Sequence, residues 1–209
     1  MATTWQKAAR KAMYKAASKE SNKKSVMDDP AFAYRWEHVR AVVKTSRKLA
    51  ALTGADGDVI EAAAWLHDVA KQAGDSHPQE GAKFARKFLP ETDFPAEKID
   101  HVAKVIKAHM GLWREKPLKD LESQVLWDAD KLTKIGVLAA VHWLGGDMTR
   151  NRIGETEDVI KRLESADWRK KTVKSMHTEP ARRAAEQRFA AYDAMLAALK
   201  AEWRADDLA

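Results

Sequence analysis

Histidines and aspartates are the residues of this 209-residue chain whose types and spacing could bind a metal ion. His67 and Asp68 are adjacent in the apolar segment AAAWLHDVAK, and His38 lies in the segment WEHVRAVV. Burying imidazoles and carboxylates costs free energy unless they are paired or coordinate a metal. Neutral imidazoles together with carboxylates suit divalent ions such as Mn, Fe, Co, Ni or Zn. We therefore expect a divalent metal site that is built on these helices.

Two cations accompany the candidate metal ligands. Arg35 precedes His38 by three residues, so both lie on one helical face, and Lys71 follows His67 by four residues. Positive charge beside a metal ion would stabilise the charge of an anionic phosphate ester. For Lys71 a solvated position on the surface is an equally good interpretation.

The elements that must position these residues are predicted to be helices. Glycine (9) and proline (6) are scarce, and no segment shows the alternating pattern of a strand. The fold class is therefore all-α, with Trp36, Trp65, Trp127 and Trp143 expected in the core. Apolar spacing and terminal residues predict helices over 30–53, 57–72, 78–88, 95–109, 117–144 (before Gly145-Gly146), 155–165 and 178–203.

The N-terminal segment carries the net charge of the whole chain. Residues 1–24 contain seven basic residues and one acidic residue, Glu20, so the formal charge of +6 lies there and residues 25–209 are balanced. An apolar stripe at helical spacing makes this segment a basic amphipathic helix, with a polar linker expected at residues 18–22. The stripe, in which alanine predominates, favours docking on the protein's own body or on a second subunit over an acidic membrane or nucleic acid. We divide the chain into this arm (1–24) and a body (25–209).

Composition excludes several classes of protein. There is no cysteine, which excludes disulfide scaffolds, thiolate metal sites and cysteine nucleophiles. No apolar run reaches the roughly 20 residues that span a bilayer, and no signal peptide is present, so we expect a cytoplasmic protein. The pI of 9.4 describes the arm, and nucleic acid is therefore not the expected partner of the body. Apolar helical faces allow a homodimer.

Three segments resemble the HD superfamily of metal-dependent phosphohydrolases. They are WEHVRAVV around His38, AAWLHDVAK around His67 and Asp68, and LWDADKL around Asp130. The segments DADKLTKIG and MHTEPARRAAEQR are similar to a small bacterial branch, the HD-domain nucleotide pyrophosphohydrolase-like proteins. The resemblance covers roughly residues 30–203. It implies a single compact multi-helix HD-domain bundle with C-terminal helices, in which His38, His67, Asp68 and Asp130 bind the metal.

Two features of the implied site stay open. Asp128 and Asp130 are 200° apart on a helix, and the apolar stripe slightly favours Asp128, whereas the resemblance favours Asp130. His77 and His109 lie where dinuclear members of the superfamily place extra ligands, so one or two ions of Mn, Fe, Co, Ni or Mg are expected. His77 could equally start a helix on the surface, and His109 could interact with a helix dipole.

The resemblance implies hydrolysis of a phosphate ester or anhydride in a small phosphorylated substrate, with a nucleotide expected. Asp68 would orient water or accept its proton, while Lys71 and Arg35 would hold the charge that develops on phosphorus. One alternative is a dinuclear iron oxygenase that uses His77 and His109. Another is a non-catalytic, metal-stabilised helical module that binds a partner through its basic arm.

Overall fold

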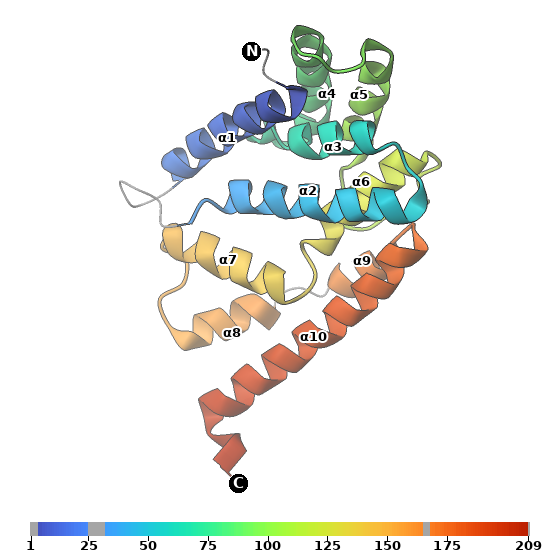
Figure 1. The fold of residues 1–209 in the computed structure, drawn as a ribbon. Coiled ribbons are helices and arrows are strands. Elements are labelled where there is room, and N and C mark those ends of the chain that lie inside the picture. Colours follow the sequence, from blue (N-terminus) through green and yellow to red (C-terminus); the bar gives the residue numbers. More distant parts are fainter. Residues whose placement is uncertain (1–3, 25–31, 165–167, 209) are drawn as a thin grey trace.

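The structure of the protein is a computed structural model that describes residues 4–24, 32–164 and 168–208 (Figure 1). These residues contain no β-strand, so the prediction of an all-α fold is confirmed. None of the described helices combines the length and the apolar character that crossing a bilayer requires. The α-helices are α1 (Trp5–Lys24), α2 (Tyr34–Thr53), α3 (Gly57–Leu66), α4 (His77–Phe88), α5 (Ile99–Ala108), α6 (Leu121–Leu132), α7 (Val137–Thr149), α8 (Thr156–Glu164), α9 (Trp168–Lys174) and α10 (Glu179–Arg204).

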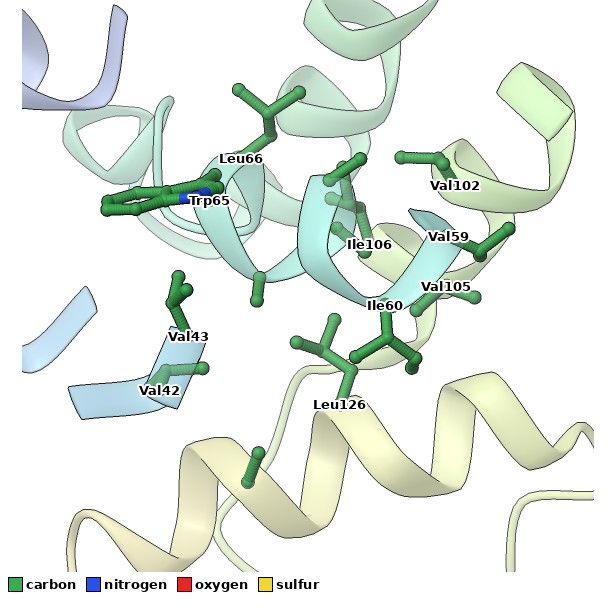
Figure 2. Close-up of a cluster of buried hydrophobic side chains, with 14 of the residues drawn as sticks. Val42, Val43, Val59, Ile60, Trp65, Leu66, Val102, Val105, Ile106 and Leu126 are labelled. Carbon is green, nitrogen blue, oxygen red and sulfur yellow. The ribbon is translucent and has the colours of Figure 1, made fainter. Parts of the chain in front are cut away.

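Helix α2 lies at the centre of the fold and contacts α1, α3, α6 and α7 (Figure 1). Its buried residues recur at helical spacing, so one broad face of the helix enters the core. Figure 2 shows Val42 and Val43 of this face in one buried cluster with Ile60 of α3 and Leu126 of α6. The first residues of the predicted helix 30–53, residues 30 and 31, lie outside the described part of the chain, and α2 begins at Tyr34.

Helix α1 packs on α2 and α3 through its apolar stripe. Trp5, Ala9, Met13 and Ala17 are buried at intervals of four residues and belong to the main core. The indole of Trp5 meets the ring of Phe94 edge to face, with 5.1 Å between ring centroids. The expected linker over residues 18–22 is wrong: α1 continues through it to Lys24 because Glu20, at its centre, is buried in an ion pair.

The predicted helix 57–72 ends earlier, at Leu66. Asp56 caps its start, accepting hydrogen bonds from the backbone N–H groups of Asp58 and Val59. At its end, Nδ1 of His67 lies 2.8 Å from the carbonyl oxygen of Ala64, the acceptor that a continuing α-helix would give to the next residue. The chain then turns and forms the short 3₁₀ helix η1 (Lys71–Ser76), so His67 and Asp68 lie at a helix end.

The predicted single helix 117–144 is two helices, α6 and α7, joined by a turn. Gly136 in this turn has a φ of 124°, a conformation that disfavours other residues. The expected stop at Gly145-Gly146 is also wrong, because α7 continues to Thr149. A Cβ atom at Gly145 would lie 2.8 Å from the ring of Phe32, so close packing explains this glycine rather than helix termination.

The C-terminal helices form a smaller second cluster beside the main core. Buried Ala140, Leu163 and Tyr192 join α7, α8 and α10. Residue 165, the last of the predicted helix 155–165, lies outside the described residues, and α9 was not predicted. The C-terminal half of α10 extends away from the body (Figure 1).

Candidate metal centre

Asp68 stands between two pairs of histidines. The Nε2 atoms of His38 and His67 lie 3.7 and 3.5 Å from its Oδ2. The Nε2 atoms of His77 and His109 lie 3.4 and 3.8 Å from its Oδ1. The four imidazoles come from α2, the end of α3, the start of α4 and the end of α5. The described residues therefore contain two potential metal-binding groups that share one carboxylate.

The far side of each imidazole is held by a hydrogen bond. In His67, His77 and His109, Nδ1 lies 2.6 to 2.8 Å from the carbonyl oxygen three residues earlier. In His38, Nδ1 lies 3.1 Å from Oγ1 of Thr133, whose hydroxyl donates to the carbonyl of Asp130. A donor at Nδ1 leaves the lone pair on Nε2, the atom that faces Asp68 in every case.

Burial keeps the imidazoles of His38 and His67 neutral. It lowers the pKa of His38 to about 4 and that of His67 to about 3. Nε2 of both residues and Oδ1 of Asp68 are buried without a hydrogen-bond partner among the described residues. Buried lone pairs that accept no hydrogen bond are costly, and a divalent cation with nitrogen and oxygen ligands would satisfy them. The residues present therefore fit a divalent metal ion.

Arg35 fixes the ionisation of Asp68. Burial alone would raise the pKa of Asp68, but the guanidinium of Arg35 and the neighbouring cationic groups hold it well below its usual range. Arg35 donates to Oδ2 of Asp68, and its Nε donates to Oε2 of Glu20 over 3.0 Å. Helix α1 is thus connected to the centre of the site. Sequence reasoning missed Glu20, although it is the one acidic residue among the first 24.

The two aspartates of α6 point in opposite directions. Oδ1 of Asp130 lies 3.1 Å from Nε2 of His38, at the metal centre. Asp128 accepts hydrogen bonds from the backbone N–H groups of His177 and Thr178 at 2.9 and 2.8 Å, so it holds the start of α10. The geometry supports Asp130 as the candidate ligand.

Three lysines line a cleft that opens onto the site. Nζ of Lys71 lies 3.3 Å from Oδ1 of Asp68 and 3.0 Å from Nε2 of His77. Lys131 and Lys134 both pair with Asp130, Lys134 at 2.6 Å. The cleft has a volume of about 360 Å³, and its walls also include His77 and His109.

Lys131 and Lys134 were not predicted as site residues. The available signal was their spacing from Asp130, since Lys131 is adjacent to it and Lys134 follows it by one helical turn. Burial lowers the pKa of Lys131 to about 8, whereas the charge of Asp130 opposes this shift.

His101, Asp120 and Glu122 form a third potential metal-binding group, but contacts within the protein account for their positions. Asp120 caps α6 through the N–H of Ser123, and it also pairs with Lys104 at 2.7 Å. Nε2 of His101 lies 3.0 Å from the same carboxylate. These contacts suit a structural ion-pair network.

Comparison with known proteins shows a similarity to one domain family over part of the chain. Residues 35–135, from α2 to the turn after α6, match the family model of the HD domain. No protein in a search of curated sequences matches the chain. A predicted HD superfamily hydrolase from an uncultured Thermotogales bacterium is similar, with 25% identity, 93% of this chain and 91% of that chain covered, and a TM-score of 0.64.

Two further solved structures share the fold. An HD-superfamily hydrolase from Bacillus thuringiensis has 22% identity and a TM-score of 0.64, with 94% of this chain and 99% of that chain covered. Bacillus subtilis YpgQ in complex with ADP has 19% identity and a TM-score of 0.63, with 91% and 97% covered. The match therefore extends beyond the region of the family model to nearly the whole chain.

Proposed function

The chain contains an HD domain in the fold of HD-superfamily hydrolases, and from this premise we propose that it is a divalent-metal-dependent phosphohydrolase. One observation carries the proposal: the carboxylate of Asp68 faces two histidine pairs at the end of a cleft that three lysines line. Imidazole and carboxylate suit the metal, and lysine suits a phosphate group. The substrate is a phosphate ester or anhydride.

The residues of the site divide the work of hydrolysis. His38, His67, Asp68 and Asp130 would hold a divalent cation, and His77 and His109 with Asp68 would hold a second. A bound divalent cation polarises phosphoryl oxygens and makes nearby water more acidic. Asp68, whose low pKa keeps it ionised, orients the attacking water. Lys71, Lys131 and Lys134 hold the phosphate oxygens as negative charge develops.

A nucleotide is the substrate class that we propose. The cleft volume of about 360 Å³ is within the usual range for small-molecule sites. YpgQ, which has the same fold, binds ADP in its crystal. The buried Lys131 and the partly buried Lys134 place two amino groups beside Asp130, which suits a phosphate chain more than a single neutral group.

A dinuclear iron oxygenase is the second candidate. The observation that favours it is the convergence of His77 and His109, whose Nε2 atoms are 3.2 Å apart, on Asp68. The three cleft lysines favour phosphate chemistry, because oxygen activation requires no such concentration of positive charge. Two irons per chain and an oxygen-dependent spectrum would support the oxygenase.

The test is a hydrolysis assay on protein stripped of metal and reloaded separately with Mn, Mg, Co or Fe. Nucleoside mono-, di- and triphosphates and simple phosphomonoesters form the panel. We expect turnover of at least one nucleotide with wild type and loss of about 10³-fold or more with Asp68→Asn. The control is Asp100→Asn, an exposed aspartate whose one ion pair among the described residues is with Arg86.

Two results would contradict the proposal. One is the absence of turnover with every metal and substrate, which would leave a metal-stabilised helical module. The other is full activity of Asp68→Asn, which would show that the reaction occurs elsewhere.

A further inference from the structure

A basic groove separates the outer faces of α1 and α2. Its cations are Lys7, Arg10 and Lys11 on α1 and Arg40, Lys44 and Arg47 on α2. The central hollow has a volume of about 380 Å³ and includes the side chain of Trp65 in its wall. The groove is thus formed only when the arm lies against the body.

Two further hollows continue the groove at its sides. One, of about 400 Å³, shares Lys7 and Arg10 with the central hollow and is lined by Tyr14 and Trp36. The other, of about 200 Å³, shares Arg40 and Lys44 and reaches α7. Because neighbouring hollows share cations, the surface is longer than one nucleotide-sized pocket.

Much of the positive charge in the groove is uncompensated. Arg40 and Arg47 form ion pairs with Glu37 and Glu61. Lys7, Lys11 and Lys44 are exposed and make no ion pair within the described part of the chain. The first 24 residues contribute the whole net charge of +6. Such a surface attracts polyanions.

Aromatic rings are interleaved with the cations. The guanidinium of Arg10 lies 5.8 Å from the ring of Trp36, and Trp36 stacks on Trp65 with 5.9 Å between centroids. Tyr14 is 55% exposed, and its ring meets Trp36 edge to face at 5.1 Å. An exposed ring beside cations, as Tyr14 is here, forms a platform on which an unpaired base stacks.

The groove is separate from the metal centre. On α2, Arg40, Lys44 and Arg47 lie about 180° to 240° around the helix from His38, by the helical angle of 100° per residue. The central hollow and the cleft with the three lysines have no lining residue in common. The metal centre therefore does not account for the charge of the groove.

We propose that the α1–α2 groove binds single-stranded nucleic acid. The row of cations tracks successive phosphates, and the exposed ring of Tyr14, which packs against the partly buried Trp36, offers a stacking surface to a base. A duplex hides its bases, and an acidic peptide has no bases to stack, so neither uses the aromatic rings. Nucleic-acid binding by the groove goes beyond the proposed hydrolase function and does not depend on it.

The experiment is fluorescence anisotropy of a labelled oligothymidylate with the full-length protein over a series of salt concentrations. We expect binding that weakens with salt. The triple variant Lys7→Gln/Lys11→Gln/Lys44→Gln should lower the slope of log K against log salt by about 2, since each lost phosphate contact removes ~0.7 on a single strand. Tyr14→Ala should weaken binding roughly tenfold.

A matched triple variant controls for net charge. Lys87, Lys107 and Lys170 are exposed lysines on α4, α5 and α9, and their replacement by Gln removes the same charge elsewhere. This control should bind as wild type does. Thermal melting by circular dichroism, unchanged in both triple variants, shows that the fold is intact.

Three outcomes would overturn the proposal. In the first, both triple variants weaken binding equally, so the attraction is only net charge. In the second, duplex DNA or polyglutamate binds as tightly as the oligothymidylate. In the third, Tyr14→Ala leaves the affinity for the single strand unchanged.

Discussion

Asp68 connects every part of the candidate site at the scale of single residues. Its two oxygens face separate histidine pairs. Arg35 donates to Oδ2, and Lys71 lies beside Oδ1. The first pair is buried completely, while the second lines the cleft. In the proposed function, substrate and solvent would therefore reach the candidate metal centre beside His77 and His109.

We predict two divalent ions per chain in the wild type and one in His77→Ala. The variant removes one of two imidazoles from the second group and leaves His38, His67 and Asp68 in place. Elemental analysis of protein dialysed against Mn gives the stoichiometry. His101→Ala, which removes a histidine outside the centre, should retain two ions. Equal metal content in wild type and His77→Ala would contradict the assignment.

A histidine outside the metal centre gives a prediction for acid stability. Burial lowers the pKa of His142 below its usual value. As the pH falls below about 6.5, His142 therefore binds a proton in the unfolded chain before it does so in the native state. The neutral side chain contributes fully to the free energy of unfolding at neutral pH, and this contribution is lost as the pH falls below about 6.5.

The variant His142→Gln lacks this titration. On going from about pH 7.5 to 5.5, the free energy of unfolding in urea should fall less for His142→Gln than for wild type, since the other histidines contribute equally to both. A parallel decrease in the two proteins would show that His142 does not titrate differently on folding.

At the scale of elements, helix ends position the site. His67 follows the last residue of α3, His77 is the first of α4, and His109 follows the last of α5. At the C-terminal end of a helix the last backbone carbonyls lack helical partners and can accept the Nδ1 proton of an imidazole, as in His67 and His109. For His77 the acceptor is the carbonyl of Gly74 in η1, the 3₁₀ helix that precedes α4. The turn between α6 and α7 has a similar role, because its Thr133 holds His38.

Replacing Gly136 by alanine should destabilise this turn. The φ of 124° is unfavourable for alanine, and the added Cβ would lie 2.9 Å from Cβ of Arg188, whose guanidinium donates to the carbonyl of Leu132. We expect a loss of about 2 kcal/mol in the free energy of unfolding, measured in urea. Gly154→Ala, where the Cβ meets open space, should change it by less than about 0.5 kcal/mol. Similar values for the two variants would contradict the claim that the turn requires glycine at position 136.

At the scale of the whole molecule, α1 is part of the folded body. Its apolar stripe enters the main core, and Glu20 reaches Arg35 beside the metal centre. Its outer face, together with α2, forms the basic groove. One helix therefore contributes to stability, to the electrostatics of the site and to the charge of the surface.

The core position of α1 predicts a large effect of Met13→Ala. Met13 is fully buried, so the truncation should leave a cavity and cost about 3 kcal/mol in the free energy of unfolding. The neighbouring Tyr14 is exposed, and Tyr14→Ala should cost less than about 0.5 kcal/mol. Denaturant titration of both variants measures the difference. A cost below about 1 kcal/mol for Met13→Ala would mean that α1 is loosely attached.

The sequence by itself determined what depends on residue type and local spacing. The period of apolar residues predicts the helices, and the types of His38, His67, Asp68 and Asp130 indicate a divalent metal. Local spacing did not predict the end of α3 or the break after α6, because hydrogen bonds to side chains and close packing decide them.

Only the tertiary structure decided which residues meet across long distances in the chain. Asp130 faces His38 while Asp128 holds α10, although the apolar stripe of the helix slightly favoured Asp128. His77 and His109 approach the same carboxylate oxygen although 32 residues separate them. Burial and approach depend on how whole helices pack, and the chain acquires those properties only when its core is assembled.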